Sequence, residues 1–109
     1  MMTPQEKHVL AMNNAEQAVL AKQLGQEVKA RRLFRKAFDF ERDVAIQAHL
    51  REEPEPIRSI LLRSAATLAL DCGEFREAER LIGMGLAGSP PNSLAEEFRC
   101  IFENIIKEQ

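Results

Sequence analysis

Two histidines and one glutamate are the residues of this chain that could perform acid–base or metal chemistry. His8 and His49 lack the HxxxH and HExxH spacings that place two metal ligands on one face of a helix. Glu41 falls within the apolar arc of a predicted amphipathic helix, where a buried carboxylate could act as a general acid or base. Helical spacing places no second carboxylate or histidine beside Glu41. We therefore expect Glu41 to reach solvent or pair with a nearby arginine or lysine, and both histidines to be solvated or packed at an edge.

The cysteines and the glycine cluster are also weak signals for a reactive site. Cys72 and Cys100 are 28 residues apart and form no CxxC motif, which favours reduced and partly buried thiols. The stretch GMGLAG, residues 83–88, lies on a predicted helix, whereas a phosphate-binding glycine loop follows a strand. We expect Gly83 and Gly85 to allow close contact between helices. No serine occupies a GxSxG motif, so the sequence predicts a protein without catalytic activity, cofactor or bound metal.

Composition predicts one soluble globular domain. Of the 109 residues, 45% are hydrophobic and 29% are charged, and the formal net charge is −2. This charge gives no overall attraction to nucleic acid or to an anionic membrane. The basic stretch KARRLFRK, residues 29–36, shares its predicted helix face with Asp39 and Asp43. No stretch approaches the roughly 18 apolar residues that a membrane span requires, and the N-terminus lacks a secretory signal pattern. We expect a cytoplasmic protein that binds neither nucleic acid nor membrane.

Capping residues, glycines and prolines divide the chain into five predicted helices and no strand. Residues 3–6, Thr-Pro-Gln-Glu, combine a capping box with a proline at the first helical position. Ser93 and Glu96 have the spacing of another capping box, and the prolines of EEPEP forbid a helix to continue through them. The predicted helices run over residues 4–24, with Gly25 as the stop; 26–51; 56–73; 74–87, with Gly88 past the end; and from 93 nearly to the C-terminus.

The chain resembles itself at an offset of 48 residues, which pairs AVLAKQLGQEVKARRLFRKAF with ATLALDCGEFREAERLIGMGL. Small residues pair with small residues, large apolar residues pair with large ones, and a glycine marks the bend in both copies. The identical pairs are Ala18/Ala66, Leu20/Leu68, Ala21/Ala69, Gly25/Gly73, Ala30/Ala78, Arg32/Arg80 and Leu33/Leu81. The pattern predicts a helical hairpin that occurs twice.

The second copy resembles a tetratricopeptide repeat, a helical hairpin of about 34 residues. The resemblance is carried by a large residue early in the first helix, a small residue at the helix crossing, a glycine-acidic-aromatic-x-x-alanine turn and a closing proline. The matching residues are Leu62, Ala66, Gly73-Glu74-Phe75-Arg76-Glu77-Ala78, Ile82, Gly85 and Pro90. The first copy matches at Ala18, Gly25, Ala30, Phe34 and Ala37, but has Asn14 and Glu27 where the family carries a large residue and an aromatic one.

The resemblance implies an all-α solenoid of two antiparallel helical hairpins with a C-terminal capping helix. In a single domain of residues 1–109 we place repeat 1 at about residues 11–44, repeat 2 at about 59–92 and the capping helix at about 93–107. The intervening segment, about residues 45–58, would be an inserted helix extension and turn. Apolar residues continue into it on the same face, which predicts that the extension is packed.

In tetratricopeptide arrays the first helix of each hairpin lines a concave groove that binds a peptide or a partner helix. The resemblance therefore implies a noncatalytic scaffold for protein–protein interaction, with Arg63 as the side chain best suited to bind a partner carboxylate. The implied groove residues are Ala15, Val19, Lys22, Arg63, Thr67 and Asp71. The sequence leaves two alternatives open. The first is a self-associating helical bundle, such as a homodimer, that serves as an oligomerisation or antitoxin-like regulatory unit, and the second is a small enzyme or nucleotide binder built around Glu41 or the glycines.

Overall fold

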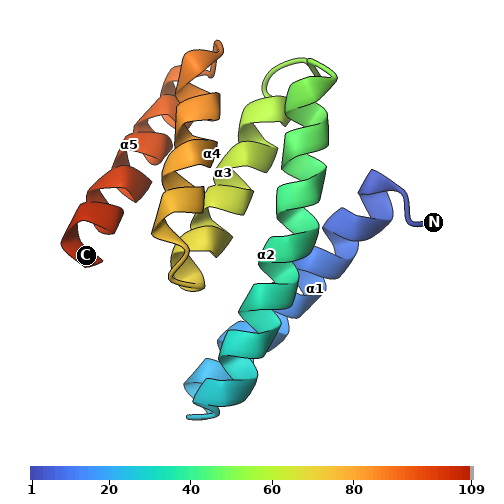
Figure 1. Ribbon diagram of the computed structural model, residues 1–109, viewed down its shortest axis with the longest axis vertical. Helices are drawn as coiled ribbons and strands as arrows, with labels where there is room; N and C mark the ends of the chain where they lie inside the picture. Colours follow the sequence, from blue (N-terminus) through green and yellow to red (C-terminus); the bar gives the residue numbers. More distant parts are fainter. Residues whose placement is uncertain (109) are drawn as a thin grey trace.

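The computed structural model describes residues 1–108, and five α-helices joined by short turns make up this part of the chain (Figure 1). The helices are α1 (Pro4–Gln23), α2 (Glu27–Leu50), α3 (Ile57–Asp71), α4 (Phe75–Ala87) and α5 (Asn92–Glu108). No strand occurs among the described residues, so the all-α prediction is confirmed. Every helix boundary lies within two residues of its predicted position, because the caps and turn residues that set the boundaries are local signals.

The helices pack in chain order, each against the next, and α3 also packs against α5. The Cα atoms extend over 39 × 38 × 21 Å, so the molecule is flat. Figure 1 looks along the thin direction: α1 crosses behind α2, and the two chain ends lie on opposite sides. α3 therefore contacts three other helices, α2, α4 and α5, although Ile57 at its start is exposed.

Alanines fill most of the helix crossings of the core. Ten buried alanines lie on α1, α2 and α3, and the large side chains that complete the core include Phe38, Leu62 and Phe98, none of which is exposed. Small residues let the helix axes approach closely, and this compensates for the chain's few aromatic side chains. The predicted extension of α2 is confirmed: the helix continues to Leu50, and Ala45 and Ala48 of the inserted segment are buried.

The two glycine turns have the same backbone geometry. Gly25 and Gly73 each have φ of 75°. Their backbone hydrogen bonds also correspond: Gly25 N–H donates to Lys22 O at 3.1 Å and Gly73 N–H to Leu70 O at 3.0 Å. The next amides do the same, since Gln26 N–H donates to Ala21 O and Glu74 N–H to Ala69 O, both at 2.8 Å. The offset of 48 residues predicted from the sequence therefore holds for these two bends.

Alanine at either bend should destabilise the fold. A Cβ at φ of 75° clashes with its own backbone, and we expect Gly25→Ala and Gly73→Ala each to lower the free energy of unfolding by about 1 kcal/mol. Glu52, at the end of α2, has φ of 52° and provides the reverse control, because Glu52→Gly should stabilise the protein by a similar amount. Urea unfolding measures all three. Unequal losses at the two glycines would contradict the equivalence of the bends.

The fifth helix departs from the prediction at its start. The capping box at Thr3 and Glu6 is present, with both hydrogen bonds at 3.1 Å, but the one predicted for Ser93 and Glu96 is wrong. The helix begins at Asn92, and the Pro91 carbonyl accepts from the amides of Leu94 and Ala95. Ser93 therefore lies inside the first turn, where it is no longer the residue that precedes the helix.

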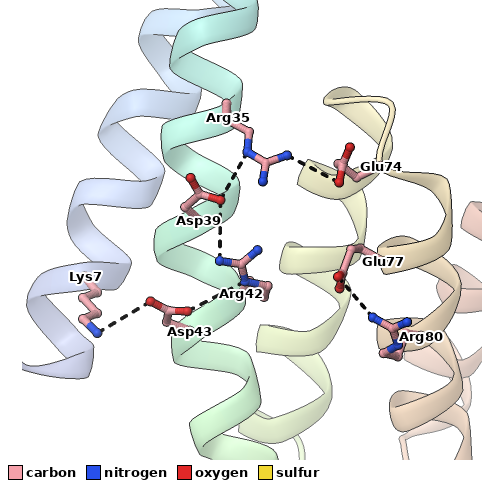
Figure 2. Close-up of polar contacts among 8 residues, drawn as sticks. All are labelled: Lys7, Arg35, Asp39, Arg42, Asp43, Glu74, Glu77 and Arg80. Carbon is pink, nitrogen blue, oxygen red and sulfur yellow. Dashed lines mark hydrogen bonds and ion pairs between the residues drawn. The ribbon is translucent and has the colours of Figure 1, made fainter.

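A chain of ion pairs joins α1, α2 and the start of α4 (Figure 2). It alternates in charge and runs along one face of α2, where the sequence predicted a charged surface. The pairs are Lys7–Asp43 (3.8 Å), Asp43–Arg42 (3.8 Å), Arg42–Asp39 (3.6 Å), Asp39–Arg35 (3.3 Å) and Arg35–Glu74 (3.4 Å). Two of its arginines also lie over the Phe38 ring, 5.1 and 5.5 Å from its centre. Exposed pairs of this kind contribute little stability individually, and of these five only Arg35–Glu74 connects α2 to the start of α4.

Candidate functional site

Glu41 of α2 and His8 of α1 form a partly buried hydrogen-bonded pair. The Glu41 side chain is 0% exposed, and both of its carboxylate oxygens lie within hydrogen-bond distance of His8 Nδ1, at 2.9 and 3.0 Å. The prediction that Glu41 reaches solvent or pairs with an arginine or lysine is therefore wrong, whereas His8, whose side chain is 39% exposed, is packed at an edge as predicted. A buried carboxylate requires a hydrogen-bonding partner, and the crossing of α1 over α2 supplies one from 33 residues away.

His8 also borders a cleft of about 420 Å³. The cleft lies where the first turns of α1, the second half of α2 and the start of α3 come together, and its walls are largely apolar. Its lining residues are Pro4, Gln5, His8, Val44, Gln47, Ala48, Arg51, Glu53, Ile57 and Leu61. Because Nδ1 of His8 is held by Glu41, the rest of the imidazole, including Nε2, is the part of the ring that can meet a ligand in this cleft.

An imidazole oriented by a carboxylate is the arrangement that enzymes use for general bases and that metal sites use for ligands. The described residues contain no group of three His, Cys, Asp or Glu side chains that could hold a metal ion. His8 therefore offers the cleft a hydrogen-bonding group of fixed orientation within apolar surroundings. This combination is typical of a binding pocket, in which a few polar groups set the orientation of an apolar ligand.

The groove residues predicted on α1 and α3 are linked at one point. Desolvation raises the pKa of the Asp71 carboxyl on α3, and the Lys22 ammonium on α1 opposes this shift. The first turns of both helices line the cleft. We call the surface of α1 and α3 from the cleft to Lys22 and Asp71 the α1–α3 groove. Val19 is exposed on α1, and Ala15 is half-buried against the core.

Arg63 is already paired within the chain. Its Nη1 donates to both carboxylate oxygens of Glu97 on α5, at 2.9 and 2.8 Å, and both side chains are partly exposed. Thr67 is exposed, and its hydroxyl donates to the Arg63 carbonyl at 3.0 Å. Arg63 thus binds a carboxylate as its chemistry predicts, but that carboxylate belongs to the fifth helix. A partner carboxylate would have to displace Glu97.

A second polar cluster, absent from the sequence prediction, is centred on Arg58. This side chain is nearly buried, and its Nη2 lies 2.9 Å from His49 Nδ1 and 2.6 Å from the Met84 carbonyl oxygen. Its Nη1 reaches Glu55 at 3.4 Å. Since a guanidinium can only donate, His49 Nδ1 must accept, so His49 is also more than a solvated residue. The cluster ties the turn between α2 and α3 to the end of α4. These hydrogen bonds are all made within the chain.

Neither cysteine is placed for catalysis. Desolvation raises the pKa of the half-buried Cys72 thiol to about 11, which keeps it protonated at neutral pH. Cys100 is exposed on α5, so the prediction of partly buried thiols holds for Cys72 and is wrong for Cys100. Among residues 1–108, no helix has the length and hydropathy needed to span a membrane.

Comparison with known proteins adds no assignment. No protein-family model, no curated protein and no solved structure matches the chain. The function must therefore be inferred from the site itself.

Proposed function

We propose that the chain is a tetratricopeptide-like module for protein–protein interaction, which binds a peptide or a partner helix in the α1–α3 groove. The two hairpins α1–α2 and α3–α4 would be the repeats, and α5 would cap the second one. The equal geometry of the Gly25 and Gly73 turns supports this arrangement, as does the packing of α5 on both α3 and α4. Each repeat would then contribute its first helix to the groove.

The observation that carries the proposal is the cleft beside the His8–Glu41 pair. Its volume, about 420 Å³, is sufficient for one or two large apolar side chains. Val44, Ala48 and Leu61 provide the apolar walls, and His8 provides one oriented hydrogen-bonding group. A partner would place an apolar anchor in the cleft and continue along the groove toward Lys22 and Asp71. Most of the affinity would come from the buried anchor, since a few central contacts dominate typical interfaces.

A peptide selection tests the proposal. A random peptide library is selected on the protein, and the affinity of the best peptide is measured by fluorescence anisotropy. Ile57 lines the cleft but is exposed, so Ile57→Glu should leave the fold intact and weaken binding by about tenfold or more. Val28 is similarly exposed but lies at the start of α2, outside the cleft lining, and Val28→Glu should bind like the wild type.

The Arg63–Glu97 pair gives a second test of the same groove. If a peptide carboxylate replaces Glu97 on Arg63, Glu97→Gln should strengthen the binding of acidic peptides, whereas Arg63→Gln should weaken it. Amide chemical shifts should change along α1 and α3 when the peptide is added. Selected peptides that shift only the resonances of α4 and α5, and that ignore Ile57→Glu, would contradict the proposal.

A further inference from the structure

Two large apolar side chains of α5 remain exposed: Phe102 and Ile106 are 42% and 60% exposed. Arg99 is exposed on the same face at helical spacing, and Ala95, one turn before Arg99, is buried. We call these four residues the α5 seam: Ala95, Arg99, Phe102 and Ile106. Next to the seam on α4 are the exposed Leu86 and Gly83, and together they form a shallow hollow.

The spacing of the seam is that of a coiled-coil interface. Its residues are separated by four, three and four positions, which is the pattern that keeps one face of a helix against a second helix. If a second copy of α5 lies antiparallel across the first, with the two-fold axis between Cys100 and Ile101, the seam matches itself. The small and largely buried Ala95 then faces the large, exposed Ile106 of the second copy. Arg99 faces Phe102 of the second copy, where a guanidinium can lie on the aromatic ring.

The charges beside the seam also match in this arrangement. Glu103 follows Phe102, so it lies at the same height along the helix as Arg99 of the second copy and on the same side of the seam. Neither Arg99 nor Glu103 has an ion-pair partner among residues 1–108. Two-fold symmetry would form the Arg99–Glu103 pair twice. A surface complementary to itself is the requirement for a symmetric homodimer.

We propose that the protein forms a two-fold symmetric homodimer in which the α5 seams of two copies pack antiparallel, with Leu86 and Gly83 of α4 at the edge. Gly83 has open space where a Cβ would stand, so its surface permits close approach of another helix. The interface uses α4 and α5, whereas the α1–α3 groove is formed by other helices. The dimer would therefore present two grooves at once.

Molar mass in solution tests the dimer. Size-exclusion chromatography with light scattering should give twice the 12.4 kDa mass of the chain for the wild type. Ile106→Glu should give the monomer mass with an unchanged helical spectrum, because Ile106 is exposed in the single chain. Val28→Glu places the same charge at another exposed apolar position and should remain dimeric. A monomeric wild type, whether or not α5 then binds a different protein, would overturn the proposal.

A charge exchange tests the register. Arg99→Glu and Glu103→Arg should each raise the dimer dissociation constant by about tenfold, since each places like charges across the two-fold axis. The double variant Arg99→Glu with Glu103→Arg restores opposite charges at both positions and should recover most of the wild-type affinity. If the double variant is as weak as the single ones, the antiparallel register is wrong.

Discussion

Replacing His8 with alanine is expected to lower the free energy of unfolding by about 3 kcal/mol, a large effect for a partly exposed residue. The cause is Glu41, whose fully buried carboxylate has His8 as its hydrogen-bonding partner, at 2.9 and 3.0 Å. Without the imidazole, a buried carboxylate loses the group that compensates for its desolvation. We place the loss at the lower end of the range for broken buried pairs because His8 itself is 39% exposed, so water can reach its position.

Three further variants separate this cause from a simple loss of packing. Glu41→Gln keeps an acceptor for the imidazole N–H and should cost less than His8→Ala. The double variant His8→Leu with Glu41→Leu removes both polar groups and should be close to wild type, or more stable. Gln17→Ala, on an exposed position of the same helix, should change stability by less than about 0.5 kcal/mol. Equal stability of His8→Ala and the wild type in urea unfolding would show that the pair does not form.

The helices could be predicted from the sequence and the His8–Glu41 pair could not, and both results have the same physical origin. Helix ends depend on residues within about four positions, such as the Thr3–Glu6 capping box or the φ of Gly25 and Gly73. The sequence carries these signals directly. The His8–Glu41 pair instead depends on the angle at which α1 crosses α2, and no spacing rule relates two residues 33 positions apart on different helices.

One local signal did point toward the site. Glu41 lies within the apolar arc of α2, and a carboxylate on the buried face of a helix needs a partner from another element. That reasoning predicts a buried pair without naming His8. For Arg58 the sequence gives less, because its partners His49 and Met84 lie on two other helices. The sequence thus shows which polar residues need hydrogen-bonding partners in the core, and the packing of the helices determines which groups become those partners.

The two glycines of α4 should respond in opposite directions to the same substitution. Gly85→Ala is expected to destabilise the protein by about 2 kcal/mol, because the added methyl would overlap the ring of Phe98 on α5. Phe98 is fully buried, so its ring has no free space into which to move. This steric cost exceeds the gain of about 1 kcal/mol that alanine brings to a helix interior. The predicted close contact between helices therefore holds at Gly85.

Gly83 is the matched control, two residues earlier in the same helix. It is exposed, and a Cβ there would meet nothing within 4 Å, so the predicted close contact between helices of the same chain is wrong at this position. Gly83→Ala should therefore stabilise the protein by about 1 kcal/mol through helix propensity alone. Both variants are best measured in the Ile106→Glu background, since self-association makes apparent stability depend on concentration. If alanine stabilises the protein at both positions, α5 does not pack on α4 through Gly85 and Phe98, and the α5 seam would have to be placed on another face of that helix.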